Sequence, residues 1–417
     1  MGKKKLLKNA MVLTRYDADP ARSSILIEGN KIVQVINENE SELSATADEV
    51  YDLSGSLIIP GAINTHTHAA MTVHRGLSDD DSFDVWLNQR ILPLEDRLDW
   101  DSVYWASLLA MCEMIRHGTT SFVDMYFFED AVASAASDIG MRAWLSRGLV
   151  DLAGDPEPRL AENLKVYENW HGKAGGRIKV GFGPHAPYTC SYSFLSRVAE
   201  IARELETFVT IHLYETPVEK EKFSILDIEE TGILDNSIIA HMVHPPDGAV
   251  EVLKRHNLII SHNPSSNLKL GNGIAPVMSL LHSGIKVGLG TDGAASNNRL
   301  DVWKEAHLAS LIHKREDPSN ITTSDVLKML WEDPGSFFGD LGRLETGYLA
   351  DLVVVDLNDT VFEPRPRIKS HLVYSAFPGQ VRSVMIDGEW VYLDGEFLTI
   401  DFRKVGIEFE KALERLL

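Results

Sequence analysis

The sequence is poor in cysteine and contains no long apolar run. Two cysteines, Cys112 and Cys190, occur among 417 residues, and neither belongs to a CxxC pair. This count excludes a disulfide-stapled scaffold and favours a reducing compartment. No stretch of about 18 apolar residues is present, which argues against a membrane-spanning helix. The basic start, GKKKLLK, is not followed by the apolar core of a signal peptide, so we expect a cytoplasmic protein.

Positive charge is also scarce. Lys and Arg number 40 against 61 Asp and Glu, which gives a formal net charge of −21. Such an acidic surface argues against nucleic acid and anionic membranes as partners, but it says little about small substrates, which meet only the local field of a pocket. With 44% hydrophobic and 24% charged residues, the chain has the composition of a globular protein with a large core. The oligomeric state stays open, a homo-oligomer included.

The two ends of the chain are β-rich, and its middle is not. Residues 1–55 contain short strand patterns and an EGN turn, and residues 346–417 contain the strand pattern DLVVVDL and two Asp-Gly turns before a closing amphipathic helix. We therefore predict a small β-sandwich domain formed by residues 1–55 plus 346–417. A larger domain, residues 56–345, is inserted between these two segments.

The inserted domain shows alternating strand and helix patterns. Amphipathic helical stretches such as DSVYWASLLAMCEMIRHG separate most of its strand candidates. Eight such units in about 290 residues are the signature of the α/β class and of a TIM-like (β/α)8 barrel. The eight strand candidates are LIIPGAINTH, TTSFVDMY, MRAWLSRGLVD, RIKVGFGPH, FVTIHLYE, SIIAHMVH, LIISHNP and KVGLGTD.

Histidines gather at the ends of these predicted strands, where the active sites of such barrels lie. Because residues i and i+2 of a strand share a face, His66 and His68 are expected to project together. An HxH pair alone is weak evidence for a metal site, but several strand ends here carry such a side chain. Six of the 15 histidines and one aspartate lie at strand ends: His66, His68, His185, His212, His241, His262 and Asp292.

Three imidazoles and one carboxylate, from His66, His68, His212 and Asp292, suit one divalent ion. We expect zinc. Iron(II) and manganese(II) are the alternatives, because the metal that is bound depends both on the order of affinities and on the supply of each ion in the cell. A second ion would need a bridging ligand, usually a modified lysine at the end of strand four. That strand ends at His185, with Lys179 six residues earlier, so we expect one metal.

A water molecule on such an ion loses its proton near neutral pH and becomes a nucleophile. Glu215 lies three residues after His212 and is the candidate acid or base, while His241 could stabilise developing charge. An ordinary surface carboxylate is the plain alternative for Glu215. These features together predict a metal-dependent hydrolase.

The motifs resemble those of the amidohydrolase superfamily, and most closely the 5-methylthioadenosine/S-adenosylhomocysteine deaminase family. The resemblance covers nearly the whole chain. It rests on NTHTH, TIHLYET, IAHMVH, GLGTDGAASNN, GYLADLVVVD, LPLEDRL, GFGPHAPYTCS and SHNPSSNLKLGNGIAPV.

This resemblance implies hydrolytic deamination of an adenine nucleoside at C6 of the ring, giving an inosine-type product and ammonia. Glu215 would relay a proton to ring N1, and His241 and Asp292 would position and deprotonate the attacking water. Substrate contacts carried over from the family are Glu95 to the ribose hydroxyls, His185 to the nucleoside, and Arg147 and Arg159 to the carboxylate of a homocysteine tail. An internal ion pair between Arg147 and Asp151 is the alternative for that arginine.

Two other functions are compatible with the sequence. Guanine deaminases and triazine aminohydrolases or chlorohydrolases would carry a similar metal set. A barrel that has lost catalysis and serves a structural role would be expected to lack the ligands, which are all present here. The sequence does not rank S-adenosylhomocysteine, 5-methylthioadenosine and adenosine as substrates.

Overall fold

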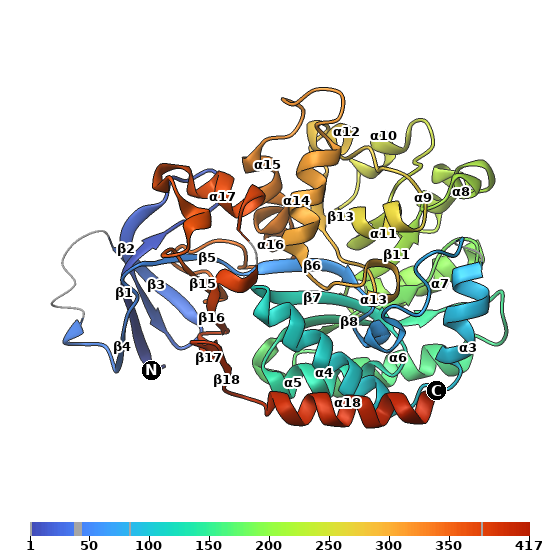
Figure 1. Ribbon diagram of the computed structural model, residues 1–417. Helices are drawn as coiled ribbons and strands as arrows, with labels where there is room; N and C mark the ends of the chain where they lie inside the picture. The colour runs from blue at the N-terminus through green and yellow to red at the C-terminus, as the bar shows by residue number, and fades with distance from the viewer. Residues whose placement is uncertain (1, 37–43, 83–84, 377) are drawn as a thin grey trace. The chain divides into compact units, whose positions relative to one another are not determined.

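A computed structural model describes residues 2–36, 44–82, 85–376 and 378–417 (Figure 1). The chain divides into two compact units. The first comprises Met1–Ile63, Glu113–Ser121 and Asp301–Asp401, and the second comprises Asn64–Cys112, Phe122–Leu300 and Phe402–Leu417. None of the helices in the described ranges combines the length and the apolarity that a bilayer crossing requires.

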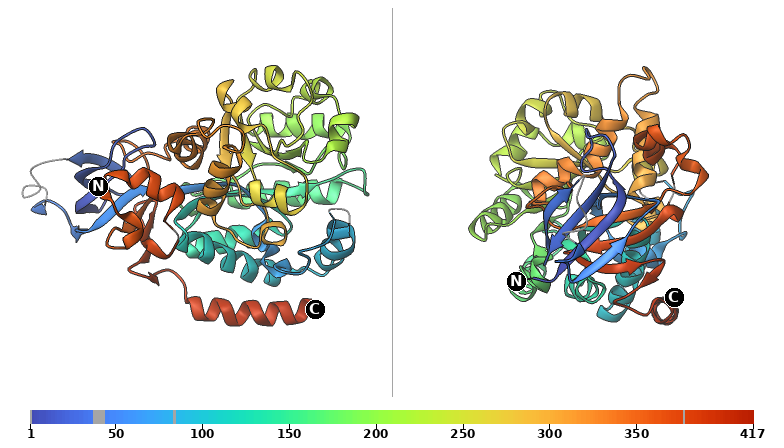
Figure 2. Two further views of the ribbon diagram at one scale, coloured as in Figure 1. Left: turned by 45° about the horizontal axis from the view of Figure 1, so that its top comes forward. Right: turned by 90° about the vertical axis from the view of Figure 1, so that its left-hand side faces the viewer.

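The first unit is built on a nine-stranded sheet, counted over the described residues, to which both ends of the chain contribute. The order is β18-β17-β16-β15-β5-β1-β2-β3, with β4 paired to β1. Figure 2 shows the N-terminal strands in blue beside the C-terminal strands in red. The strands are β1 (Lys4–Val12), β2 (Ala21–Glu28), β3 (Lys31–Ile36), β4 (Glu49–Asp52), β5 (Ser56–Pro60), β15 (Leu352–Asp356), β16 (Val381–Ile386), β17 (Glu389–Leu393) and β18 (Glu396–Phe397).

The expected turns form in this sheet. The EGN turn joins β2 to β3 as an antiparallel hairpin. Asp387 and Gly388 join β16 to β17, and both have positive φ, 55° and 77°. Asp and Gly adopt this left-handed backbone more readily than most residues, which is why the Asp-Gly pair is a reliable hairpin signal. The predicted β domain from the two chain ends is therefore present.

The second unit contains the predicted barrel. Its sheet runs in the order β10-β8-β7-β6-β14-β13-β12-β11, with β9 paired to β8. The two ends of this path meet at a parallel bridge between Phe182 and Val209, and the amide of His212 donates to the carbonyl of His185 at 3.0 Å. The strands are β6 (Ala62–Thr67), β7 (Thr119–Tyr126), β8 (Arg142–Leu149), β9 (Ile178–Val180), β10 (Gly183–Pro184), β11 (Val209–Leu213), β12 (Ser237–His241), β13 (Leu258–His262) and β14 (Lys286–Leu289).

One predicted strand is in fact two. The LIIPGAINTH pattern splits into β5, which ends at Pro60 and belongs to the first sheet, and β6, which enters the barrel. Proline cannot donate to a sheet ladder. At Gly61 a Cβ atom would lie 2.1 Å from Oγ1 of Thr120, so the backbone passes too closely for any side chain. The chain therefore passes from the first sheet to the barrel sheet at a Pro-Gly step inside one apolar run.

Helices follow most barrel strands, as expected. Figure 1 shows α4 and α5 along the strands β7 and β8. Ser191 caps α7 by accepting from the Phe194 amide at 3.2 Å. The helices of this unit are α3 (Leu92–Glu95), α4 (Trp100–Arg116), α5 (Glu129–Ile139), α6 (Glu157–Trp170), α7 (Tyr192–Glu204), α8 (Pro217–Lys222), α9 (Ile225–Glu230), α10 (Ala249–Leu253), α11 (Pro264–Lys269), α12 (Val277–His282), α13 (Ala294–Asn297) and α18 (Phe402–Leu416), with a 3-10 turn η1 (Ala69–His74) and a π-helical turn η2 (Trp86–Ile91).

The predicted domain limits stay a prediction, and the compact units differ from them in four places. Residues 56–63 and 113–121, which include the first residues of β6 and β7 and the end of α4, fall in the first unit. Residues 301–345, which include α14 (Val302–Ile312), α15 (Thr323–Leu330) and α16 (Glu332–Phe338), fall in the first unit, as does α17 (Ile368–Tyr374). The closing helix α18 falls in the second unit. There Arg97 donates to the carbonyl of Leu416, and Lys404 lies over the ring of Trp105 at 5.7 Å.

Candidate active site

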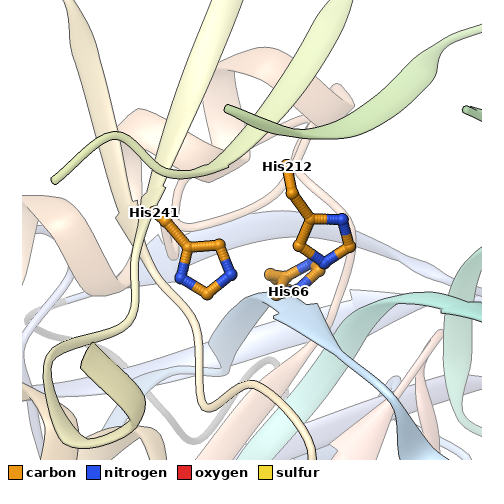
Figure 3. A group of neighbouring side chains, drawn as sticks. All are labelled: His66, His212 and His241. Carbon is orange, nitrogen blue, oxygen red and sulfur yellow. The ribbon is translucent and has the colours of Figure 1, made fainter. Parts of the chain in front are cut away.

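Five predicted residues converge where the barrel strands end. Figure 3 shows the rings of His66, His212 and His241 turned toward one another from β6, β11 and β12. The donor atoms of these three side chains lie within 4.8 Å of one another, and so do those of His66, His68 and Asp292. Because His66 belongs to both groups, the two sets form a single cluster. The parallel strands bring together residues that are more than two hundred positions apart in the chain.

Three of the four imidazoles are oriented by a hydrogen bond at Nδ1. Each acceptor is an oxygen, so Nδ1 carries a proton and Nε2 is the nitrogen that faces the cluster. Such bonds fix the ring orientation and the tautomer of metal-binding histidines. The pairs are His68 Nδ1 with the carbonyl of Met125 (2.5 Å), His212 Nδ1 with the carbonyl of His185 (2.8 Å), and His241 Nδ1 with Oδ1 of Asn267 (2.9 Å).

His66 is the centre of the cluster. Its side chain is fully buried, and neither ring nitrogen has a hydrogen-bond partner among the described residues. Burial holds the pKa of His66 well below its usual range, and burial does the same for His212. Both rings are therefore neutral, as metal ligands must be. A buried, unsatisfied ring nitrogen costs about 1–3 kcal/mol, a penalty that a coordinated cation would remove.

Asp292 presents one carboxylate oxygen to the cluster. Its Oδ1 lies 3.2 Å from Nε2 of His68 and 3.7 Å from Nε2 of His66. Its Oδ2 accepts hydrogen bonds from the hydroxyls of Ser266 at 2.6 Å and Ser296 at 3.0 Å. Burial favours the neutral acid, but the hydrogen bond and charge of His68 outweigh it and hold the pKa of Asp292 well below its usual range.

The contact between His68 and Asp292 shifts the pKa of His68 upward, opposite to its effect on Asp292. Burial lowers the pKa of its imidazole, but the hydrogen bond and charge of Asp292 raise the pKa to about 9. Without a cation, a proton on His68 therefore balances the negative charge of Asp292. A divalent ion between the two would take the place of that proton. The donor set thus fits a divalent cation.

The backbone turns sharply at two of these residues. His241 and Asp292 have φ of 74° and 59°, in the left-handed region, where a residue with a side chain costs about 1–2 kcal/mol. The amide of Asp292 donates to the carbonyl of His66 at 3.0 Å, so the turn is held by the neighbouring strand. Strain of this kind persists where the surroundings enforce it, and it is concentrated at functional sites.

Glu215 is buried beside His241, so its interpretation as a surface carboxylate is wrong. Its Oε1 accepts a hydrogen bond from Nδ2 of Asn272 at 2.8 Å, and its Oε2 lies 3.7 Å from Nε2 of His241. The residue is only 5% exposed, and this burial raises the pKa of Glu215 to about 7. A carboxyl group with that pKa can both give and take a proton near neutral pH.

His185 and Glu95 lie close to the histidine cluster. The ring centroid of His185 is 4.9 Å from that of His212, and its Nδ1 bonds to the hydroxyl of Thr189 at 2.9 Å. Burial lowers the pKa of His185 to about 4, so this ring is neutral at pH 7. Glu95 ends α3, and its Oε1 accepts a hydrogen bond from the hydroxyl of Tyr126 at 2.7 Å. Both His68 and Arg147 act electrostatically on the Glu95 carboxylate.

Arg147 and Arg159 lie near one another but do not join the histidine cluster. The Nε of Arg147 pairs with Glu162 at 2.8 Å, so the predicted alternative of a pair with Asp151 is wrong. Asp151 instead accepts from the amide of Ser191 at 2.7 Å. Burial lowers the pKa of Arg159, and the charge of Arg147 lowers it further. The buried Nη1 of Arg159 has no hydrogen-bond partner among the described residues.

Three polar residues of this site were missed from the sequence: Ser266, Asn267 and Asn272. They lie in and just after α11, which follows β13, and they support Asp292, His241 and Glu215 in turn. The available signal was the stretch HNPSSNLKLGN, whose Ser and Asn residues come directly after a predicted barrel strand. Serine and asparagine are common in loops, so only their position after that strand marks them out.

Comparisons with known proteins identify relatives of this chain. The sequence model of the amidohydrolase family matches residues 57–391. A 5-methylthioadenosine/S-adenosylhomocysteine deaminase of Thermotoga maritima is 46% identical over 389 residues, covering 93% of each chain. A 5'-deoxyadenosine deaminase of Methanosarcina mazei is 42% identical over 428 residues, covering 99% of this chain and 98% of that one.

A solved structure shares both the fold and part of the sequence. The crystal structure of an adenosine deaminase from Xanthomonas campestris with bound zinc superposes with a TM-score of 0.93 and is 27% identical, covering 100% of this chain and 99% of that chain. The family model spans the barrel together with β5, β15 and β16 of the first sheet, and the relatives cover nearly the whole length. This chain therefore belongs to the amidohydrolase family.

Proposed function

We propose that this chain is a metal-dependent aminohydrolase that deaminates an adenine nucleoside to the inosine-type product and ammonia. The observation that carries the proposal is Glu215, a buried carboxyl group with a pKa of about 7 beside a cluster of imidazoles and one aspartate. The relatives named for deamination of 5-methylthioadenosine, S-adenosylhomocysteine and 5'-deoxyadenosine support it. The substrate is thus S-adenosylhomocysteine, 5-methylthioadenosine or adenosine.

His66, His68, His212 and Asp292 are the proposed ligands of one divalent ion, with zinc favoured over iron or manganese. The zinc in the Xanthomonas deaminase supports this choice, as do the unsatisfied nitrogens of His66. When bound, such an ion lowers the pKa of a water molecule toward neutrality and so supplies a nucleophile. His241 offers an additional nitrogen in the same cluster, and its place beside Glu215 favours a catalytic role over that of a ligand.

The protein's own groups then move the protons. Nε2 of His241 and Oδ1 of Asp292 would orient the attacking water and accept its proton. Glu215, half protonated near pH 7, would deliver a proton from Oε2 to ring N1, since Asn272 occupies Oε1. Protonation at N1 draws electron density from C6 and favours attack there. The proton that His241 or Asp292 has accepted would then pass to the amino group, which leaves as ammonia, and the second proton of the water would return to Glu215.

The nucleoside would be held by Glu95 and His185. The carboxylate of Glu95 lies in the field of both His68 and Arg147, which supports a place for the ribose between the reacting ring and the tail. The neutral imidazole of His185 has its Nδ1 engaged with Thr189, which leaves Nε2 for the substrate.

Arg147 and Arg159 are the proposed site for the carboxylate of a homocysteine tail. The two guanidinium groups repel each other, and the buried Nη1 of Arg159 has no hydrogen-bond partner among the described residues. A bound anion would stabilise both groups. The carboxylate of Glu162 already occupies Nε of Arg147, which supports Arg159 as the stronger contact. Without an anionic tail, this pair of arginines would contribute little to binding.

A substrate panel tests the proposed function. The metal-loaded chain is assayed for ammonia release from adenosine, 5-methylthioadenosine, S-adenosylhomocysteine and guanine, and for turnover of an amino- and a chlorotriazine. Release from the nucleosides and not from guanine is the expected result. Release from guanine alone, or turnover of triazines alone, would assign a related amidohydrolase activity. No release from any of them, in a chain that holds no metal after gentle purification, would favour a non-catalytic barrel.

A further inference from the structure

The three residues that follow one another at the end of β7 each contact a different part of the site. The carbonyl of Met125 accepts from Nδ1 of His68. The hydroxyl of Tyr126 donates to Glu95, and the ring of Phe127 lies under the guanidinium of Arg147 at 4.6 Å. One short segment thus supports a metal ligand, a ribose contact and a tail contact.

Tyr126 is rigidly held in this segment. It is 3% exposed, and its ring centroid lies 6.0 Å from that of His68. Its backbone amide donates to Oε1 of Glu129 at 2.7 Å, and the Glu129 side chain is completely buried at the start of α5. A buried tyrosine normally finds a partner for its hydroxyl. Here that partner is the carboxylate of Glu95.

The hydrogen bond divides the two oxygens of Glu95 between protein and ligand. Oε1 accepts from the Tyr126 hydroxyl at 2.7 Å, whereas Oε2 has no hydrogen-bond partner among the described residues. The bond also favours the ionised form of a carboxylate whose burial raises its pKa. An ionised oxygen with free lone pairs, held in one direction, is the acceptor that a ribose hydroxyl requires.

We propose that Tyr126 is a positioning residue that selects ribosides: its hydroxyl aims the Glu95 carboxylate so that Oε2 receives the sugar hydroxyls. This inference rests on the proposed function and names the part of the substrate that the segment recognises. Tyr126 itself does not touch the reacting ring in this arrangement. Its removal would therefore weaken binding of the sugar and leave the chemical step at C6 intact.

The test compares Tyr126→Phe with the parent on two substrates, adenosine and 2',3'-dideoxyadenosine, which lacks the 2'- and 3'-hydroxyls of the ribose. A hydrogen bond to a charged group predicts that KM for adenosine rises about tenfold, with kcat close to the parent value. KM for the dideoxy compound should not change. In a Glu95→Gln background the Tyr126→Phe effect should disappear, because the two side chains act as one unit.

Tyr104→Phe is the matched control. It removes a similar bond, from the Tyr104 hydroxyl to Asp138 at 2.6 Å, between α4 and α5. It should leave both KM values unchanged. An equal rise in KM for both substrates in Tyr126→Phe, or no rise for either, would overturn the inference while the proposed function stands. A parent chain that releases ammonia from neither nucleoside would overturn both.

Discussion

Asn272 donates a hydrogen bond from Nδ2 to Oε1 of Glu215 at 2.8 Å, although 57 positions separate the two residues. This bond leaves Oε2 of Glu215 directed toward His241, 3.7 Å from its Nε2. The asparagine therefore decides which oxygen is available for proton transfer.

Glu215→Gln should lower kcat for adenine nucleosides by about 10²–10⁴-fold, the usual contribution of general acid–base catalysis, because an amide cannot supply the proton. Metal content should stay at the parent level, since Glu215 is not a proposed ligand. Ammonia release and elemental analysis measure the two effects. The exposed Glu221→Gln is the matched control. Loss of metal together with activity would show Glu215 to be a ligand.

The same variant should change the pH dependence of stability in the metal-free protein. The pKa of Glu215 is raised from 4.5 to about 7, so its ionisation is harder in the folded state than in the unfolded chain. The resulting destabilisation is absent below pH 4.5, grows as pH rises toward 7 and reaches about 3 kcal/mol above it. The unfolding temperature of Glu215→Gln should therefore rise relative to that of the parent as the pH increases from 5 to 8. A constant difference across that range would contradict the prediction.

His66→Ala should abolish stable metal binding, because His66 belongs to both groups of converging donor atoms. Elemental analysis after gentle purification should find the parent loaded and the variant empty. Removal of the metal from the parent with a chelator should likewise abolish activity, and added zinc should restore it. The exposed His282→Ala serves as the control. Full metal occupancy in His66→Ala would refute the proposed ligand set.

Arg159→Ala should raise KM for S-adenosylhomocysteine about tenfold, the size expected for a lost bond to a charged group, and leave KM for adenosine unchanged. The contrast arises because only the first substrate carries a carboxylate in its tail. The surface arginine change Arg255→Ala, whose residue pairs with Glu229, is the control. An equal effect on both substrates would place Arg159 elsewhere in the recognition of the nucleoside.

Much of this site could be predicted because parallel strands impose a simple rule. The side chains at their C-terminal ends meet, so His66, His212 and Asp292 could be grouped from their places in eight apolar runs. The rule does not extend to Asn267 and Asn272, whose contacts depend on how α11 packs after β13. Nor does it find Tyr126, which reads as one more apolar residue of a buried strand.

Two features of the fold could not be predicted from local sequence patterns, because they too depend on tertiary contacts. The split at Pro60 is masked by apolar residues on both sides, and the close approach of Thr120 to Gly61 cannot be seen in the sequence. The terminal helix was recognised as amphipathic, but its periodicity does not say which surface covers it. The contacts of Leu416 and Lys404 with α4 and its preceding loop decide that question.

The sheet of the first unit has a consequence for how the chain is made. β5 lies between β1 and β15, so the central strand needs a neighbour from each end of the polypeptide. During synthesis, β1 to β5 leave the ribosome long before β15 exists, and until then one edge of β5 has no partner. Unpaired strand edges invite association with other chains. The barrel strands β6 to β14 are all synthesised before β15, so we expect the sheet of the first unit to form last.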